Sequence, residues 1–250
     1  MARRLSDVSP GRVRELNAGA PASNLMESLT VDFAELLRRA VPGLPASGVD
    51  TMRAARGEGY TKRMRIASAI LLEHAGESAI EALGAHPSDT VRGWACYAVG
   101  SVAPDVDDAL RRVRVFAGDA HYGVREWAWL GVRAHVVAQP RRALDLLEAW
   151  ATDDDANIRR FASEATRPRG VWCAHIAELK SDPSPALPLL EALRADDHKY
   201  VQDSVANWLN DASKTRPEWT VGVCERWRAG SPVLATERIC RRALRTLSRD

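Results

Sequence analysis

A short phrase that begins a helix recurs four times along this chain and constrains its fold more than any other feature. The phrase reads HPSDTVR, DAHYGVR, DDANIR and DDHKYVQ at residues 86–92, 119–125, 154–159 and 196–202. Its aliphatic positions, Val91, Val124, Ile158 and Val201, are 33, 34 and 43 residues apart, an interval typical of a two-helix repeat. We expect an aspartate to cap each helix start, the aliphatic residue to pack on the preceding repeat, and the adjacent arginine to lie on a wetter face.

The segments between these phrases show helical periodicity and none of the alternation of a half-buried strand. Partner helices are predicted over residues 106–116, 141–151, 172–179 and 188–194, with an earlier unit over 60–83 and a closing pair over 218–228 and 235–247. The sequence therefore predicts an all-α fold, an α-α superhelix that forms a single curved domain. Its concave side is the expected binding surface.

Composition excludes several classes of protein. The chain has 250 residues, of which 46% are hydrophobic and 27% are charged, as in globular domains and unlike disordered, collagen-like or membrane proteins. Four separated cysteines without a CxxC pair indicate a reduced, cytoplasmic, metal-free protein. The arginine-rich start lacks the apolar stretch of an export signal. We expect residues 1–22 to be a basic, flexible segment and residues 23–250 to form the repeat domain.

Positive charge is distributed unevenly, although the net charge is only +2. Residues 236–249 contain five arginines and one acid on a predicted helix with an apolar opposite face. Such a stripe can face nucleic acid phosphates, or it can be an ordinary solvated helix face; charge alone leaves both open.

Three polar phrases interrupt otherwise apolar helices: REWAW at 125–129, SEATRPRGVW at 163–172 and SVANWLNDASK at 204–214. The first places a Glu in an opening helical turn, which the helix dipole also favours. The third places Asn207, Asn210, Asp211 and Lys214 on one face, which alone would be read as solvent-facing. The P-loop, GxSxG and HExxH motifs are all absent from the chain, and the six histidines are scattered.

The longer phrases carry a family resemblance. SEATRPRGVW, SVANWLNDASKTRPEW at 204–219, RICRRALRTL at 238–247 and NLMESLTVDFAELL at 24–37 resemble the AlkC branch of the AlkC/AlkD superfamily of HEAT-like DNA glycosylases. The resemblance extends from about Asn24 to the end of the chain. It implies base excision repair: binding of duplex DNA and hydrolysis of the N-glycosidic bond of a cationic alkylated base, typically 3-methyladenine and also 3-methylcytosine. It further implies that the base is not flipped into a pocket.

The same resemblance implies the site residues. The catalytic acidic and aromatic positions of the family fall on Glu164, Trp172 and Asp211, and Glu126 is the expected third carboxylate. DNA-binding positions are predicted in the same phrases, at the repeat starts and in the last helix: Arg167, Arg169, Lys214, Arg125, Arg159, Asn207, Arg241, Arg242 and Arg245.

No cofactor or metal is expected, because a base that already carries positive charge leaves as a neutral molecule. We expect a monomeric, monofunctional glycosylase, with Lys214 the alternative amine of a lyase, in the cytoplasm, bound to the nucleoid through DNA. The immunoglobulin-like domain that follows the repeats in some AlkC proteins is expected to be absent. The alternatives are a glycosylase for bulky natural-product adducts and a catalytically inactive DNA-binding or scaffold protein.

Overall fold

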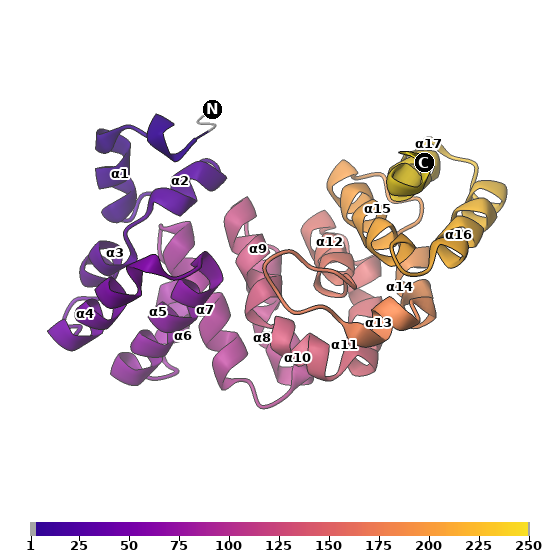
Figure 1. Ribbon diagram of the computed structural model, residues 1–250. Helices are drawn as coiled ribbons and strands as arrows, with labels where there is room; N and C mark the ends of the chain where they lie inside the picture. Colours follow the sequence, from indigo (N-terminus) through magenta and orange to yellow (C-terminus); the bar gives the residue numbers. More distant parts are fainter. Residues whose placement is uncertain (1–3, 250) are drawn as a thin grey trace. The chain divides into compact units, whose positions relative to one another are not determined.

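The computed structural model describes residues 4–249, and the elements in this range are helices without any strand. The chain divides into two compact units (Figure 1). The first comprises the described residues up to Ala103 together with Asp119–Gly131, and the second comprises Pro104–Gly118 and the chain from Val132 onward. The all-α prediction is confirmed. The sequence predicted one domain over residues 23–250 and did not reveal this division.

The first unit contains eight α-helices and two short 3-10 helices. They are η1 (Leu5–Asp7), α1 (Pro10–Asn17), α2 (Leu25–Thr30), α3 (Phe33–Ala40), α4 (Ala46–Ala54), η2 (Ala55–Gly57), α5 (Tyr60–Ala75), α6 (Ala79–Gly84), α7 (Asp89–Val102) and α9 (Tyr122–Gly131). Helix α7 lies in the core, with Val91 and Trp94 fully buried. Helix α9 approaches it so closely that a Cβ atom on Gly131 would lie 2.5 Å from the Cys96 carbonyl oxygen. Glycine at 131 therefore permits the contact between α7 and α9.

The second unit holds the remaining helices. They are α8 (Val106–Ala117), α10 (Arg133–Ala138), α11 (Pro140–Glu148), η3 (Ala149–Thr152), α12 (Ala156–Ala165), α13 (Ala177–Ser181), η4 (Ser184–Ala186), α14 (Leu187–Ala192), α15 (Lys199–Ser213), α16 (Pro217–Gly230), α17 (Leu234–Ala243) and η5 (Leu244–Arg249). Helix α15 packs against both α12 and α17 (Figure 1). Its apolar side buries Val201, Val205 and Trp208.

The four repeat phrases do begin α7, α9, α12 and α15, but aspartate is not their only cap. Asp155 accepts the Asn157 amide at 2.8 Å, as predicted. In two other copies the aspartate accepts the amide of a histidine, and that histidine then accepts the amide of the second helical residue, as His121 does from Gly123 at 3.1 Å. The histidines of the phrase are thus capping residues.

The arginines of the repeat phrase donate hydrogen bonds both to carbonyls of the preceding loop and to the aspartate of the next phrase. Arg92 donates to Asp119 at 3.0 Å and to two carbonyls of the loop before α7. Arg159 pairs in the same way with Asp196 at 2.6 Å and with the carbonyls of Asp153 and Asp154. These side chains are largely buried, so the prediction that they lie on a wetter face is wrong. Their donors are directed to backbone oxygens and to the aspartate of the following phrase.

Two local predictions also differ from the structure. The helix predicted over residues 172–179 is a loop as far as Ile176, and only α13 is helical. Residues 10–17, inside the segment predicted to be flexible, form helix α1, and Arg12 of that helix pairs with Glu27 of α2 at 2.8 Å. Met1 to Arg3 lie outside the described residues. Between residues 4 and 249 no helix has both the length and the apolar character needed to cross a membrane.

A candidate carboxylate site in the second unit

Two carboxylates predicted as catalytic, Glu164 on α12 and Asp211 on α15, share one arginine. Arg167 donates from Nη1 to Glu164 Oε1 at 2.7 Å and from Nε to Asp211 Oδ2 at 2.9 Å, and its Nη2 lies 2.8 Å from the same Asp211 oxygen. Glu164 is 4% exposed and Asp211 is 3% exposed. The packing of α12 on α15 brings together two residues that are 47 positions apart in the sequence.

Glu164 has further partners. Ser204 on α15 donates its hydroxyl to Oε2 at 2.7 Å, and the guanidinium of Arg160 lies 3.5 Å from the same oxygen. Burial raises the pKa of this carboxyl group, but the charges of Arg160 and Arg167 and the bond from Ser204 outweigh that effect and hold the pKa below its usual value. Glu164 is therefore ionised at neutral pH although it is buried.

Asp211 is held from its own helix as well. Lys214 Nζ lies 3.0 Å from Oδ1, one helical turn away. The neighbouring Asn210 is 3% exposed and donates to the Ala243 carbonyl and to Thr246 Oγ1, both at 2.8 Å. Asn210 and Asp211 are buried on this face of α15. The interpretation of the polar face of the 204–214 phrase as simply solvent-facing is therefore wrong. Asn210 holds the end of the chain against α15, and Asp211 belongs to the carboxylate site.

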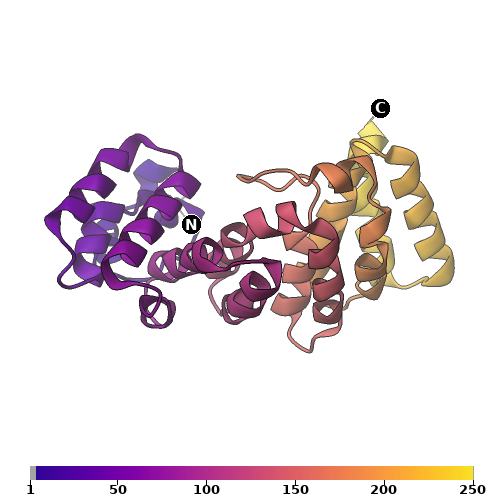
Figure 2. The same cartoon turned by 90° about the horizontal axis from the view of Figure 1, so that it is seen from below.

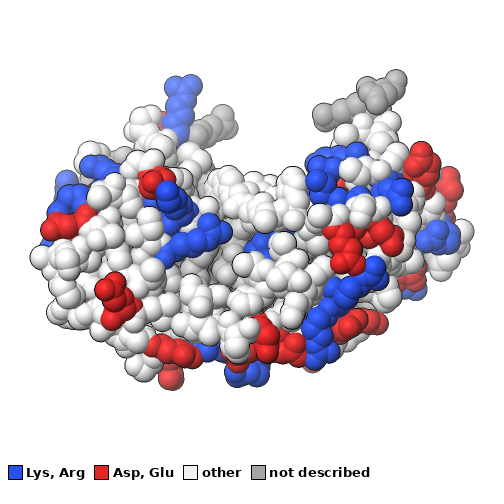
Figure 3. Space-filling view, turned by 60° about the horizontal axis from the view of Figure 1, so that its bottom comes forward, with Lys and Arg blue, Asp and Glu red and all other residues white. Residues whose placement is uncertain are grey.

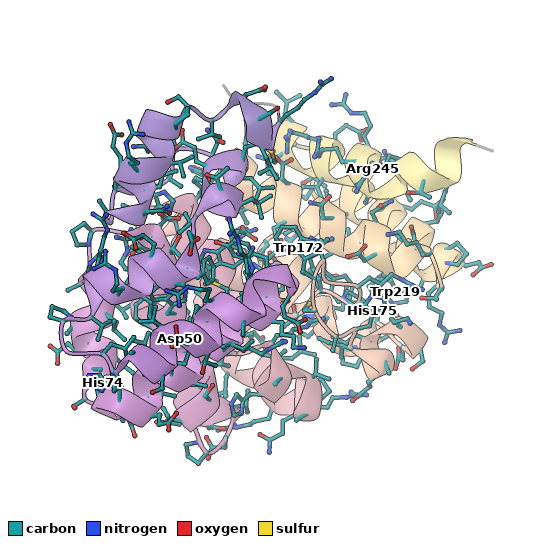
Figure 4. The ribbon with its side chains drawn as sticks, turned by 60° about the vertical axis from the view of Figure 1, so that its left-hand side comes forward. Asp50, His74, Trp172, His175, Trp219 and Arg245 are labelled. Carbon is teal, nitrogen blue, oxygen red and sulfur yellow. The ribbon has the colours of Figure 1, made fainter. Side chains whose placement is uncertain are left out.

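Trp172 lies on the loop that follows α12. Its backbone has φ = +62°, and it is the one non-glycine residue with positive φ in the described part of the chain. A side chain is disfavoured in this left-handed region, so the conformation is held by its surroundings. The indole is 50% exposed. The loop extends away from the helices of the second unit (Figure 2), and Trp172 and His175 can be followed on it in Figure 4.

Glu126, the expected third carboxylate, belongs to the first unit. It lies on α9 and accepts the Trp129 Nε1 proton at 2.9 Å. Trp127 and Trp129 of the same phrase are both 3% exposed. The structure thus brings Glu164 and Asp211 together in one cluster and places Glu126 in a different unit.

Most of the predicted phosphate ligands are engaged within the protein. Arg125 donates to the carbonyls of Asp119 and Ala120, and Arg159 has the bonds described above, so both act as structural residues at repeat starts. Arg167 bridges the two carboxylates, and Lys214 pairs with Asp211. In each case a carbonyl or carboxylate within reach accepts from the side chain, and the assignment of these residues to DNA phosphates stays a prediction.

The cations of the last helix are more open to solvent. Arg242 pairs with Asp203 at 3.0 Å, Arg245 donates to Asn207 at 3.0 Å, and Arg241 is exposed. Arg169, on the Trp172 loop, has a buried Nε atom with no hydrogen-bond partner among the described residues. Figure 3 shows Lys and Arg side chains next to Asp and Glu at several places on a face that is otherwise mostly uncharged.

Two residues that complete the cluster, Arg160 and Ser204, had no assigned role in the prediction. Arg160 precedes Glu164 by four residues, a spacing at which two side chains of a helix lie on the same face and can pair. This contact could therefore have been predicted once the helix was known. Ser204 opens the second family phrase, but its contact with Glu164 depends on how α12 packs on α15. The described residues contain no group of three or more His, Cys, Asp or Glu side chains that could hold a metal ion.

The cluster can present negative charge that is fixed in position. Each carboxylate has roughly four lone-pair sites, and the hydrogen bonds above occupy two at Glu164 and two at Asp211. The acceptor capacity that these bonds leave could serve a water molecule or a group that develops positive charge. The fixed partners remove the reorganisation that a mobile carboxylate would need.

Comparison with known proteins assigns this arrangement to a family. The sequence profile described as DNA alkylation repair enzyme matches residues 65–232. The uncharacterized protein YhaZ of Bacillus subtilis is 39% identical over 135 residues, which cover 54% of this chain and 36% of YhaZ. The alkylpurine DNA glycosylase AlkC of Pseudomonas fluorescens, solved bound to DNA containing an abasic site analog, superposes with a TM-score of 0.71 at 26% identity over 99% of this chain.

The chain spans about a third of YhaZ and 66% of the AlkC structure. AlkD2 of Streptococcus mutans, at 17% identity and a TM-score of 0.55 over 85% of this chain, shares the fold. The predicted helical-repeat architecture is therefore confirmed, and so is the resemblance read from the two long phrases. The chain belongs to the family of DNA alkylation repair enzymes, whose AlkC and AlkD-like members are built from HEAT-like helical repeats.

Proposed function

We propose that this chain is a DNA glycosylase that releases cationic alkylated bases, with 3-methyladenine as the principal substrate and 3-methylcytosine as a second. The observation that carries the proposal is the pair of buried carboxylates, Glu164 and Asp211, joined by Arg167 in a member of this repair family. Trp172, exposed at 50% on the loop that leaves α12, is the proposed contact to the sugar. Glu126 is proposed as a supporting carboxylate from the first unit.

The proposed reaction needs no acid for the leaving group. The C1′–N bond breaks with its electron pair going to the base, which departs as a neutral molecule and leaves an oxocarbenium-like sugar. Water then adds to C1′ and loses one proton, giving an abasic site. The open acceptor sites of Glu164 and Asp211 would orient that water and receive its proton, and their charge would stabilise the cationic sugar.

The size of this stabilisation is limited by the neighbouring cations. One carboxylate about 4 Å from a positive charge contributes about 4 kcal/mol at an effective dielectric constant near 20. The cluster, however, contains Arg160, Arg167 and Lys214 beside the two carboxylates. We therefore expect each carboxylate to contribute about 2–3 kcal/mol, a factor of roughly 100 in rate. An indole against the sugar adds about 1 kcal/mol as the ring becomes cationic.

The test is the release of free base from duplex DNA that contains 3-methyladenine, with a 3-methylcytosine duplex alongside. The proposal predicts free base in solution and alkali-labile abasic sites in the DNA. If folded protein binds the duplex and neither product appears, the enzymatic proposal is wrong. Faster release of a bulky cationic adduct than of 3-methyladenine would favour the alternative of a glycosylase for bulky adducts.

Lys214 bears on whether the enzyme also cleaves the strand. Its amine lies 3.0 Å from Asp211 and donates to that carboxylate, so it is engaged in an ion pair and is not free to attack C1′. We infer a monofunctional glycosylase. Borohydride treatment during turnover should trap no covalent protein–DNA adduct, and a trapped adduct that disappears in Lys214→Met would show a lyase instead.

One observation favours a second candidate function. All four oxygens of Glu164 and Asp211 already have cationic or hydroxyl partners, an arrangement that also suits a structural cluster in a DNA-binding protein without catalysis. That protein would bind duplex DNA with strong salt dependence, release no base and lose no DNA affinity on Asp211→Asn.

A further inference from the structure

Arg133, the first residue of α10, is buried at 2% exposure and makes an unusual set of bonds. Its Nη1 donates to the Ala165 carbonyl at 2.6 Å, its Nη2 to the Arg167 carbonyl at 2.7 Å and its Nε to the Ala174 carbonyl at 3.0 Å. Ala165 is the last residue of α12, and the other two carbonyls lie on the loop that carries Trp172. One side chain therefore holds both ends of that loop.

The start of the loop is also held by Arg167, which donates to Glu164 and Asp211, and by Thr166, which accepts the Trp208 Nε1 proton at 3.2 Å. One backbone bond closes the loop, from the Ile176 amide to the Pro168 carbonyl at 3.1 Å. At its tip, Val171 is 59% exposed and Trp172 is 50% exposed, so packing does not fix them. Trp172 nevertheless adopts φ = +62°, which a residue with a side chain avoids when it is free to relax. Something at the base of the loop must therefore define its path, and the bonds of Arg133 lie there.

Only an arginine can make these bonds. The planar guanidinium offers five N–H donors in fixed directions, whereas the ammonium of lysine is a single compact group that cannot reach three separated carbonyls. Burial lowers the pKa of Arg133, yet arginine keeps its charge in proteins, and charged donors make stronger bonds to carbonyls than neutral ones. The chain thus places a buried cation where its hydrogen bonds go to the backbone of a single loop.

We propose that Arg133 is a positioning residue that holds the 166–176 loop in the conformation in which Trp172 meets the sugar of the damaged nucleotide. Arg133 acts through the backbone of that loop and does not itself touch DNA. The role of Trp172 in this statement rests on the glycosylase function proposed above. The restraint that Arg133 places on the loop does not, and it can be measured on the protein without DNA.

The conformational part is tested by fluorine NMR of the full chain labelled with 5-fluorotryptophan. The chain has eight tryptophans, and loss of one resonance in Trp172→Phe assigns the signal of Trp172. We expect that signal to broaden or split in Arg133→Lys while the other seven stay in place. Arg92→Lys is the matched control, because Arg92 also donates to two loop carbonyls but lies in the first unit. An unchanged Trp172 signal in Arg133→Lys would overturn the proposal.

If Arg133→Lys shows no cooperative unfolding transition, the same measurement is made on Arg133→Ala with and without millimolar methylguanidinium. A small guanidinium ion that enters the vacated space should restore the Trp172 signal of the unsubstituted protein. Failure to restore it in a folded Arg133→Ala, at concentrations that saturate any binding, would also contradict the proposal.

The functional part is tested by single-turnover release of 3-methyladenine from duplex DNA. The contact of the Trp172 indole with the sugar contributes about fivefold to the rate, so we expect a loss of up to about fivefold in Arg133→Lys, with DNA affinity within about twofold of the parent. Because Arg133 acts only through Trp172, Arg133→Lys combined with Trp172→Phe should be no slower than Trp172→Phe alone. If the rate losses of the two single substitutions multiply in the double variant, Arg133 affects the reaction by a route other than Trp172. If the parent protein releases no base, the glycosylase proposal fails, while the NMR result still decides whether Arg133 holds the loop.

Discussion

Arg167 is the residue on which the candidate site depends. It pairs with both Glu164 and Asp211, and its side chain is 13% exposed. Without it, two like charges would lie in a buried environment with less compensation. The arginine was predicted to hold a DNA phosphate. In the structure it pairs with both acids, and against the effect of burial its charge, together with that of Arg160, holds the pKa of Glu164 below its usual value.

Replacing Arg167 by Met should destabilise the fold strongly. Removing one partner of a buried ion pair typically costs about 3–5 kcal/mol, because the remaining charge has lost its compensation. The measurement is the free energy of unfolding in urea. Arg141→Met is the control, since Arg141 pairs with Glu178 on the surface with 60% of its side chain exposed, and such pairs contribute at most about 1 kcal/mol. Equal losses in the two variants would contradict the structural role of Arg167.

Glu164 should make stability depend on pH in a defined direction. Its pKa is lower in the folded protein than in an unfolded chain, where a glutamate titrates near about 4.3. The stabilisation from the ionised form is therefore complete above that pH and is lost as the pH falls through the lower, folded-state pKa. The difference in unfolding free energy between the parent and Glu164→Gln should shrink steadily from about pH 5 to pH 3. A difference that is constant over this range would contradict the assignment.

The sequence predicted Glu164 and Asp211 as site acids, and the structure brings them together, but the residues that hold them were not predicted. Glu164, Trp172 and Asp211 stand in the two family phrases and could be named directly. The arginines were harder to assign, because a guanidinium that bonds a buried carbonyl looks the same in a sequence as one that faces DNA. Arg133 lies 41 residues before Ala174, and no local signal connects the two.

Among the helices, the repeat phrases predicted the starts of α7, α9, α12 and α15 because the aliphatic anchor and the capping group stand at fixed positions. The prediction failed after α12, where apolar residues from Trp172 onward have helical spacing. The positive φ of Trp172 interrupts any helix there, and Arg133 takes the loop carbonyls that a helix would use internally. Tertiary contacts decided this segment against its local pattern.

The contact between α7 and α9 gives a prediction about packing. A Cβ atom at position 131 would lie 2.5 Å from the Cys96 carbonyl oxygen and 2.7 Å from its carbon, and both are backbone atoms that cannot rotate away. We expect Gly131→Ala to lower the unfolding free energy by about 3 kcal/mol, at the upper end of overpacking costs. Gly57→Ala, where a Cβ meets nothing within 4 Å, is the control and should change little. Thermal and urea unfolding of both variants provide the comparison.

For the molecule as a whole, the class of fold was predictable and its division into units was not. Helical periodicity and the repeat interval predicted the all-α architecture, and the phrases predicted the family. The composition is uniform along the chain. Because α9 belongs to the first unit and α8 to the second, the division does not coincide with any linker in the sequence.

The ion pairs lead to a prediction about DNA affinity. A cation that neutralises a phosphate contributes about one to the slope of log K against log salt, whereas a cation engaged within the fold contributes nothing. We expect Arg241→Ala to reduce the slope by about 1 between 50 and 200 mM salt. Arg159→Ala should leave the slope unchanged and lower the melting temperature, because Arg159 is bonded to Asp196 and to two loop carbonyls. Fluorescence anisotropy with a labelled duplex measures the slopes, and the reverse pattern would contradict this division of roles.

The central claim is that Glu164 and Asp211 stabilise a cationic sugar as the damaged base departs. The most direct measurement is single-turnover release of 3-methyladenine by Glu164→Gln and Asp211→Asn, with DNA affinity measured on the same preparations and Glu178→Gln as control. The account predicts rates about a hundredfold below the parent in both site variants, affinities within about threefold, and a parental rate in the control. Parental rates in both site variants, with folding and affinity intact, would contradict it.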